Sequence, residues 1–450
     1  MEARDREGWG TRSGFILAAI GSAVGLGNMW RFPYVTAENG GAAFVFFYIL
    51  MVLLVGVPVM LAEFTIGRRT RLSPIGAMLK AGGRAWMPLG YLFVATGFLI
   101  LSYYSVIAGW TMRYTLEAAL GGFSTTPAEY FSAASEGTSA VIYHLAFMGI
   151  TIAVVAGGIK MGIERASLVL MPLLFLLVMG LAIWAIFLPG AEAGYSFYLR
   201  PNPQRLFSLE TLGAAAGQAF FSLSLGMGAM LTYASYLSKQ EDLPSAGVTI
   251  AGSDFLVAFL AGMVVFPVIF ALGLSDEIGE STIGALFISL PRAFTAMGDG
   301  GRIIGLIFFS ALFVGALTSG ISLLEVVVSS LIDTWQLPRA TAALGAGLVI
   351  TLIGVPSAYS TNVLAIFDQV AGNLFLVFGA FALTIFVGWR MDYPVTELQQ
   401  GFRSEGLLRG WHFTLKFFVP IILAVVLYQV GKDTTLVLYQ VVKDILALVF

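Results

Sequence analysis

Residues 21–28 read GSAVGLGN and residues 222–228 read SLSLGMG, and these two stretches decide the fold. Each places a Gly-x-Gly pattern and small hydroxyl side chains in the middle of a long apolar segment. Glycine inside a helix costs about 1 kcal/mol relative to alanine, and irregular backbone at membrane depth is tolerated only within protein or beside a cavity. One such stretch is also typical of close helix packing through small residues. Two of them predict a pair of helices that unwind in mid-membrane.

The composition of the chain predicts a membrane protein. Of its 450 residues, 58% are hydrophobic and 11% are charged, against about 25% charged in a soluble domain. The apolar blocks are continuous and about 20 residues or longer, as in membrane-spanning helices, and they lack the alternation of barrel strands. No basic patch indicates nucleic acid. The chain has no cysteine, which excludes disulfides and thiol chemistry, and its two histidines, His144 and His412, stand too far apart to suggest a metal site.

We therefore predict an all-α integral membrane protein with about eleven transmembrane helices. The predicted spans are 12–37, 41–66, 88–118, 139–158, 166–188, 211–237, 246–273, 302–332, 341–356, 363–389 and 411–430. The apolar runs after Gly431 are too short to cross a bilayer, so this part is expected to be a tail. The long connection 274–301 is expected to contain a helix over 283–297.

The distribution of lysine and arginine predicts the orientation. Basic residues precede the first span and follow the second and tenth spans: Arg4, Arg6, Arg12, Arg68, Arg69, Arg71, Lys80, Arg84, Arg390, Arg403 and Arg409. These residues fall on one side if the spans alternate, whereas the connection 119–138 contains Glu129 and Glu136 and no basic residue. We expect a multi-pass protein of the cell (inner) membrane, with a cytoplasmic N-terminus and an extracellular or periplasmic C-terminus.

The two glycine-rich stretches lie in the first and sixth of the predicted spans. This placement is typical of transporters built from two related halves with a binding site between them. We divide the chain accordingly into an N-terminal segment (1–10), a first half with helices 1–5 (11–200), a second half with helices 6–10 (201–390), and a last part (391–450) with helix 11 and an extracellular tail.

Several motifs together resemble the neurotransmitter:sodium symporter family, in its bacterial amino-acid transporter branch. Residues 25–28 read GLGN, residues 30–34 WRFPY and residues 38–41 ENGG. The similarity continues at 58–63, 67–68, 103–104, 162–165, 171–172, 218–236, 317–319 and 367–368. It covers nearly the whole chain and is highly specific in combination. The resemblance implies a five-plus-five inverted repeat with unwound helices 1 and 6, and sodium-driven symport by alternating access.

Unwound helices suit both expected ligands. Their free carbonyl oxygens suit a sodium ion, and the N–H groups of half-helix N-termini suit a carboxylate. The resemblance implies that the amides of Leu26 and Gly27 bind the substrate carboxylate with help from the Tyr104 hydroxyl. The implied substrate site consists of Ser22, Ala23, Leu26, Gly27, Ile100, Tyr104, Phe221, Ser222, Ser224, Met227, Ser319, Ser322 and Leu323.

The resemblance also implies two sodium sites as the only cofactor sites. The first comprises the substrate carboxylate, the Ala23 carbonyl, Asn28, Ser222 and Asp254, so that ion and substrate are coupled directly. The second comprises the carbonyls of Gly21, Val24 and Gly315 and the hydroxyls of Thr318 and Ser319. Taken alone, without the resemblance, Thr318 and Ser319 are more typical of hydroxyls bonded to their own helix.

Asp254 departs from the family pattern, because the bacterial leucine transporter and most animal members have asparagine at this position. A carboxylate in mid-membrane is costly and indicates a function, although a structural role among polar neighbours is the alternative. Animal members bind chloride near this sodium site. We therefore expect Asp254 to supply the negative charge and to make chloride unnecessary.

The predicted pocket indicates the substrate class. Gly25 matches the position at which monoamine members carry an aspartate for the substrate amine, so the substrate is expected to bring its own carboxylate. No charged side chain lines the predicted pocket, and an unpaired charge there would be costly. Met227 replaces a phenylalanine of the leucine transporter, and methionine adapts its shape readily. These features favour large hydrophobic or aromatic neutral L-amino acids, with plain packing as the alternative role of Phe221 and Met227.

Two gates follow from the resemblance. Arg31 and Asp368 would form the outer pair, with Tyr104 and Phe221 closing over the substrate, although Arg31 alone is also compatible with snorkelling to the interface. The inner gate would comprise Arg6, Trp9, Ser235, Tyr236 and Asp333.

Three residues or pairs outside these sites carry further expectations. Glu63 is expected to brace unwound backbone, and Gly162 with Pro172 is expected to let span five unwind at an inner sodium exit. Glu325 has no assigned partner.

Other functions within this fold stay open. An amino-acid exchanger, a proton-coupled carrier, a channel-like member or a non-transporting receptor would keep the same sites. The neutral oxygens of Asn28, Thr318 and Ser319 favour sodium, while Asp254 leaves room for a proton. The sequence shows no nucleophile–base pair or metal cluster of an enzyme. The expected partners are a neutral amino acid, sodium and the lipid bilayer, with no nucleic acid and no obligate protein partner.

Overall fold

The computed structural model describes residues 7–121, 123, 126–200, 208–274, 285–402 and 404–449. In these ranges the chain forms helices and no strand, which confirms the all-α prediction. Among the described residues, nine helices are long and apolar enough to cross a membrane: Ala42–Thr70, Met87–Leu120, Gly137–Ala156, Ile159–Ile186, Leu243–Ala271, Asp299–Trp335, Arg339–Tyr359, Thr361–Trp389 and Glu405–Tyr439. A tenth span consists of a helix pair, Arg12–Ala23 and Gly27–Glu38, bent by 45°.

The predicted sixth span, 211–237, is a broken helix. It consists of α11 (Leu209–Ser222) and α12 (Ala229–Ala234), each too short to cross a bilayer alone. Between them Ser224, Gly226 and Gly228 have φ angles of 53°, 80° and 72°, a region that side chains with a Cβ rarely adopt. The first span likewise consists of α1 (Arg12–Ala23), η1 (Gly27–Arg31) and α2 (Phe32–Glu38). The helix breaks therefore fall at the two stretches that the sequence singled out.

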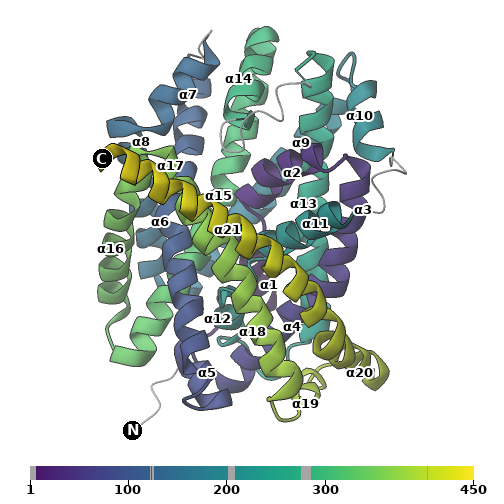
Figure 1. The fold of residues 1–450 in the computed structure, drawn as a ribbon, viewed down its shortest axis with the longest axis vertical. Coiled ribbons are helices and arrows are strands. Elements are labelled where there is room, and N and C mark those ends of the chain that lie inside the picture. The colour runs from purple at the N-terminus through teal and green to yellow at the C-terminus, as the bar shows by residue number, and fades with distance from the viewer. Residues whose placement is uncertain are drawn as a thin grey trace.

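The other helices surround these two broken spans (Figure 1). Those of the first half are α3 (Ala42–Met51), η2 (Val52–Gly56), α4 (Val57–Thr70), α5 (Pro74–Gly82), α6 (Met87–Leu120), α7 (Pro127–Ser135), α8 (Gly137–Ala156), η3 (Ile159–Glu164), α9 (Arg165–Ile186) and α10 (Glu192–Leu199). The remainder are α13 (Leu243–Ala271), α14 (Ala285–Ala296), α15 (Asp299–Trp335), α16 (Arg339–Tyr359), α17 (Thr361–Phe367), η5 (Asp368–Phe375), α18 (Leu376–Trp389), α19 (Pro394–Leu398), α20 (Glu405–Phe413), η6 (Thr414–Phe418) and α21 (Val419–Val449).

The connections between the spans gather at two opposite ends of the bundle. In Figure 1, α7, α10 and α14 lie at the upper end, and α5, α19 and α20 lie at the lower end. This separation agrees with the predicted alternation of the spans. The helix expected over 283–297 is α14, Ala285–Ala296, while residues 283 and 284 lie outside the described residues.

The expectation of a tail after Gly431 is wrong. Helix α21 continues from Val419 to Val449, and Figure 1 shows it crossing the bundle diagonally. Gly431 does not end the helix because one glycine costs only about 1 kcal/mol and no proline follows it. The hydroxyls of Thr434 and Thr435 donate to the carbonyls of Val430 and Gly431, each at 2.8 Å. The apolar runs after Gly431 are too short to cross a bilayer alone, but they continue the helix that begins before Gly431.

Glu63 holds the break in the sixth span, as expected for a brace of unwound backbone. This residue of α4 is fully buried, and its two carboxylate oxygens accept hydrogen bonds from Gly226 N at 2.8 Å and Leu231 N at 3.0 Å. The carboxylate thus satisfies N–H groups that lack a helical partner at the N-terminus of α12.

We predict that Glu63→Gln lowers the thermal stability of the protein. The glutamine amide has the shape of the carboxylate, but its NH₂ group replaces one of the two oxygens that accept from backbone N–H groups. One backbone N–H then faces another donor and stays unsatisfied, and an unsatisfied buried donor costs about 3 kcal/mol. Thermal unfolding of the purified protein measures the effect. Glu405→Gln is the matched control, because the Glu405 side chain is 64% exposed and pairs with the exposed Arg409. Equal melting temperatures for the two variants would contradict a bracing role.

Candidate functional site

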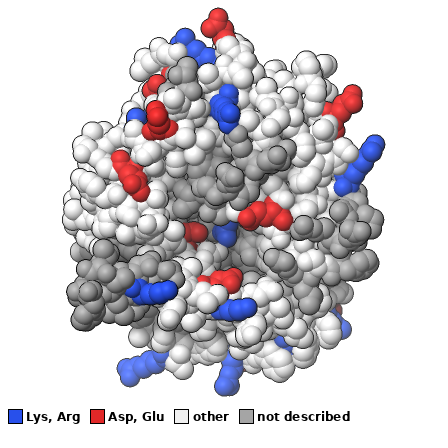
Figure 2. Space-filling view, turned by 45° about the horizontal axis from the view of Figure 1, so that its top comes forward, with Lys and Arg blue, Asp and Glu red and all other residues white. Residues whose placement is uncertain are grey.

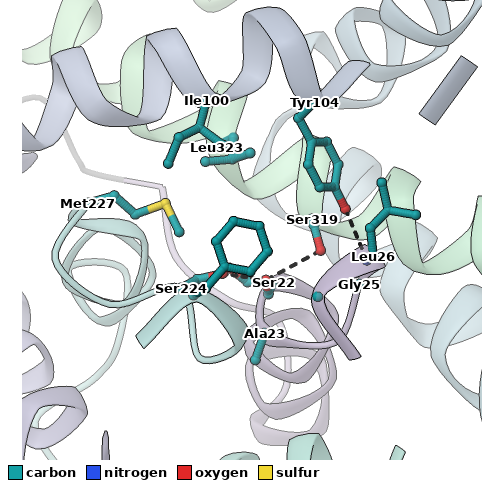
Figure 3. Close-up of a pocket in the computed structure, with 12 residues that line it drawn as sticks. Ser22, Ala23, Gly25, Leu26, Ile100, Tyr104, Ser224, Met227, Ser319 and Leu323 are labelled. Carbon is teal, nitrogen blue, oxygen red and sulfur yellow. Dashed lines mark hydrogen bonds between the residues drawn. The ribbon is translucent and has the colours of Figure 1, made fainter. Parts of the chain in front are cut away.

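A small cavity lies where the two broken spans meet α6 and α15 (Figure 3). Its volume of about 30 Å³ is enough for roughly two water molecules. The lining residues are Ser22, Ala23, Gly25, Leu26, Gly27, Ile100, Tyr104, Phe221, Ser224, Met227, Ser319 and Leu323. The structure therefore brings together the predicted substrate residues apart from Ser222 and Ser322, which lie behind this lining. An amino acid is larger than this cavity, so its binding requires lining side chains to move.

The two ends of the cavity differ in chemistry. Figure 3 shows Tyr104, Leu26 and Gly25 at one end and Met227 at the other. Leu26 N donates a hydrogen bond to the Tyr104 hydroxyl at 3.4 Å, so an amide and a phenol face the same space. Among the lining residues none is charged, and the cavity suits a molecule with one polar end and an uncharged side chain.

Gly25 is a lining residue that the implied substrate set omitted. A Cβ at this position would lie 2.9 Å from the Tyr104 hydroxyl and still closer to Ser319 Oγ. A real Cβ does not approach other atoms so closely. A side chain at residue 25 therefore requires Ser319 and Tyr104 to shift.

The floor of the cavity consists of bonded serine hydroxyls. Ser224 Oγ donates to the Ser22 carbonyl at 2.7 Å, and Ser22 Oγ donates to Ser322 Oγ at 2.8 Å. Ser322 Oγ in turn donates to the Ser319 carbonyl at 2.8 Å. These bonds join α1, the break in the sixth span and α15, which fixes the unwound segments relative to each other.

The predicted first sodium site is a polar cluster around Asp254 of α13. Asp254 is fully buried, and its carboxylate accepts hydrogen bonds from Asn28 Nδ2 at 2.7 Å and from Ser222 Oγ at 2.9 and 3.0 Å. Asn28 Oδ1 accepts from Gly25 N at 3.0 Å. Three side chains of the predicted set thus converge, and Ala23 lines the adjoining cavity.

Tyr48, which the sequence motifs did not indicate, completes this cluster. Its hydroxyl donates to Asp254 Oδ2 at 3.0 Å, and the side chain is fully buried in α3. The available signal was a tyrosine in an otherwise apolar helix, because a buried phenol needs a hydrogen-bond partner. With Tyr48, three side chains donate to the carboxylate and stabilise it in a buried position.

The predicted second sodium site lies between α1 and α15. Ser319 Oγ is 3.3 Å from the Gly21 carbonyl and 3.4 Å from the Val24 carbonyl. Thr318 Oγ1 donates to the Gly315 carbonyl at 3.1 Å, so it does bond to its own helix. A Cβ on Gly315 would lie 3.7 Å from the Val24 carbonyl. The predicted residues are therefore neighbours, and their neutral oxygens suit a hard monovalent cation.

The predicted outer pair, Arg31 with Asp368, is not a direct ion pair in the described structure. Arg31 Nη2 donates instead to Asn373 Oδ1 at 2.8 Å, and Asp368 accepts from the Tyr103 hydroxyl at 2.8 Å. Asn373 Nδ2 lies 3.4 Å from Asp368 Oδ2 and so links the two charges. The sequence offered the charged pair but not this amide, because only the local helix geometry brings it to Arg31.

Arg31 also covers the cavity. Its guanidinium carbon lies 4.4 Å from the ring centre of Phe221, a distance that permits cation–π attraction. Figure 2 shows a hollow on the upper side of the molecule, with basic atoms in its floor and acidic atoms around it. Phe221 also lines the cavity, as does Tyr104.

At the lower end, the segment before α1 closes the bundle. Trp9 Nε1 donates to the Tyr233 carbonyl at 3.0 Å, and its ring packs edge-on against Tyr233 and Tyr236. Asp333 Oδ2 accepts from Ser73 N at 2.6 Å. Ser235 is buried beside these residues, while Arg6, the remaining member of the predicted inner gate, lies outside the described residues.

Glu325 has partners that the sequence did not reveal. It is fully buried, accepts from the Tyr236 hydroxyl at 2.6 Å, and pairs with Arg339 Nη1 at 2.7 Å. Arg339 also pairs with Glu7 at 2.9 Å, and Glu7 accepts from Ile159 N at 2.9 Å. The lower end therefore joins the N-terminal segment to α15, α16 and η3.

The start of span five carries a second carboxylate contact. Glu164 of η3 accepts from Gly10 N at 2.6 Å and from the Thr11 hydroxyl at 2.7 Å. Gly162 lies in the same π-helical turn, and Pro172 lies within α9. Single π-helical turns within α-helices occur frequently at functional sites, and the unwinding of this segment stays a prediction.

Comparison with known proteins decides the family. Residues 6–125 and 133–441 match the family described as the Sodium:neurotransmitter symporter family. This chain belongs to the sodium:neurotransmitter symporter family. An uncharacterized sodium-dependent transporter of Bacillus subtilis, YhdH, is 35% identical over 93% of this chain and 96% of its own length. One of Methanocaldococcus jannaschii, MJ1319, is 35% identical over 95% of this chain and 91% of its own length.

A solved structure shows the same symporter fold. The crystal structure of MhsT in complex with L-phenylalanine is 40% identical and has a TM-score of 0.87. The similarity covers 94% of this chain and all of the MhsT chain. This symporter family member is therefore a sodium-coupled, multi-pass membrane transporter of the bacterial type, and the family is one of transporters.

Proposed function

We propose that the protein carries large hydrophobic or aromatic neutral L-amino acids together with two sodium ions and without chloride. The cavity carries this proposal: backbone amide and phenol groups lie at one end, Met227 lies at the other, and no lining residue is charged. The relative MhsT, of known structure, was crystallised in complex with L-phenylalanine, an amino acid of the expected class.

In this proposal, Leu26 N, Gly27 N and the Tyr104 hydroxyl bind the substrate carboxylate. Half-helix N-termini favour negative charge, and η1 begins at Gly27. The aromatic or aliphatic side chain occupies the space beside Ile100 and Met227. Methionine accommodates different shapes because it is unbranched and flexible.

The first sodium ion binds at the cluster of Asn28, Ser222 and Asp254 and contacts the substrate carboxylate, and the second binds between α1 and α15. Asp254 supplies a fixed negative charge beside the first ion, so that no chloride is required. Each ion gains about 2.3 kcal/mol per 100 mV of membrane potential and about 1.4 kcal/mol per tenfold gradient. Two ions thus supply about 7 kcal/mol, enough to concentrate a zwitterion about 10⁵-fold.

Alternating access follows from two opposed closures. Arg31, Asn373 and Asp368 close the upper end, which we assign to the outside of the cell, and Trp9 with its neighbours closes the lower, cytoplasmic end. In this proposal the upper and lower closures open in turn, and unwinding around Gly162 opens the inner sodium exit.

Uptake of labelled L-tryptophan into proteoliposomes tests the proposal. We expect uptake that requires an inward sodium gradient, persists when gluconate replaces chloride, and is blocked by unlabelled leucine and tyrosine but not by glycine or GABA. Inhibition by small amino acids alone would overturn the interpretation of Met227. If folded protein shows no sodium-driven uptake, an exchanger, a proton-coupled carrier or a receptor becomes the better interpretation.

A further inference from the structure

The outer closure has a component that lies in the last helix of the chain. Thr434 of α21 is buried, and its hydroxyl accepts a hydrogen bond from Gln369 Nε2 at 3.0 Å. Gln369 follows Asp368 directly in η5. Buried polar side chains of neighbouring membrane helices hydrogen-bond to one another. This bond connects α21 to η5, the segment whose Asn373 binds Arg31.

The contact between Asn373 and Arg31 depends on the π-helical winding of η5. In an α-helix, residues five apart point about 140° away from each other. In a π-helix, they lie on one face. Asn373 Nδ2 therefore reaches the Asp368 carbonyl at 3.2 Å, while its Oδ1 accepts from Arg31. A shift of η5 toward α-helical winding would turn Asn373 away from Arg31.

Helix α21 contacts both sides of the closure. Besides η5 and α18, it packs on α11, where Gln429 Oε1 occupies the place that a Cβ on Gly213 would need. Helix α11 carries Phe221, which lies under the Arg31 guanidinium. Gln369 Oε1 lies 3.5 Å from Asn373 Nδ2, which is at the limit for a hydrogen bond. The hydrogen bond from Gln369 to Thr434, at 3.0 Å, is therefore the stronger of the two bonds of the Gln369 side chain.

We propose that Thr434 and Gln369 are positioning residues of the outer gate: through their hydrogen bond, α21 holds η5 in the register that presents Asn373 to Arg31. The proposal rests on the transport cycle proposed above, and it adds a role for the last helix. Breaking the bond shifts the gate toward its open form, without altering the sodium ligands.

Accessibility of an engineered thiol tests this role without any substrate. The chain has no cysteine, so Ile100→Cys places a single thiol in the cavity. An impermeant methanethiosulfonate reagent, applied to whole cells in sodium medium, then reports opening of the outer gate. In this background, Thr434→Val is expected to raise the modification rate about threefold to tenfold, the effect of one lost hydrogen bond. Thr434→Ser, which keeps the acceptor, is expected to match the parent.

Thr435→Val is the matched control, because Thr435 bonds to its own helix as Thr434 does but is exposed and does not contact Gln369. Its modification rate is expected to stay at the parent value. In an Asn373→Ala background, Thr434→Val is expected to add nothing, because both changes act on the same contact. An unchanged rate in Thr434→Val, or an additive effect with Asn373→Ala, overturns the proposal. Absence of sodium-driven tryptophan uptake in the unaltered protein would instead reject the proposed function.

Discussion

Asp254→Asn is expected to lower the affinity for sodium about 100-fold to 1000-fold. At about 4 Å and an effective dielectric constant of about 20, a unit charge contributes about 4 kcal/mol to the binding of an ion, which corresponds to about a thousandfold in affinity. The variant also places an amide donor opposite Asn28 Nδ2, Ser222 or Tyr48, which already donate to this carboxylate. Sodium titration of tryptophan binding to purified protein measures the effect.

Chloride separates the charge of Asp254 from its hydrogen bonds. If Asp254 stands in for an anion, chloride should partly restore sodium-dependent binding in Asp254→Asn and leave the unaltered protein unaffected. Tyr48→Phe is the control, because it removes one hydrogen bond and keeps the charge; a smaller loss of about tenfold is expected. A strict chloride requirement in the unaltered protein, or equal losses in the two variants, contradicts this role.

Gly25→Ala is expected to reduce sodium-driven tryptophan uptake about 100-fold. The added Cβ would overlap Ser319 Oγ and crowd the Tyr104 hydroxyl, and overpacking of this kind costs about 3 kcal/mol, equal to about 100-fold. The loss should affect both substrate and ion, because Ser319 also faces the Gly21 and Val24 carbonyls. Initial uptake rates at varied sodium and tryptophan concentrations measure both.

Gly180→Ala is the control for Gly25→Ala. Gly180 lies in α9, and no atom lies within 4 Å of a Cβ added there, so the change should leave uptake intact. Normal uptake by Gly25→Ala would show that the amide end of the cavity is not where the substrate binds.

The sequence allowed much of the fold to be predicted because its irregularities are local. The helix breaks at 21–28 and 222–228 were predictable because glycine and serine stand there in apolar surroundings. These residues do not stabilise a regular helix at such positions. The end of α21 was not predictable in the same way. Gly431 resembles a helix end, and only the hydrogen bonds of the continuing helix and its packing on η5 and α11 show that the chain stays helical.

Side-chain partners were harder to predict than site positions. Arg31 and Asp368 were evident as charges, yet the π-helical winding of η5 places Asn373 between them. The sequence showed Glu325 as a carboxylate in an apolar span but did not indicate its partner. The structure places Arg339, at the start of the next helix, beside it. Both arrangements depend on the register of helices that meet in space, which residue type and spacing do not determine.

The N-terminal segment sets how often the lower end of the bundle opens. Among the described residues, five hydrogen bonds hold it: Trp9 Nε1 to the Tyr233 carbonyl, Gly10 N and Thr11 Oγ1 to Glu164, and Ile159 N and Arg339 Nε to Glu7. Losing one of these bonds removes about 1 kcal/mol of stabilisation from the closed form, which corresponds to about a fivefold larger open population. An affinity tag or label fused just before residue 7 would disturb this balance, and we expect single-molecule fluorescence to show a larger open population than a tag after residue 450.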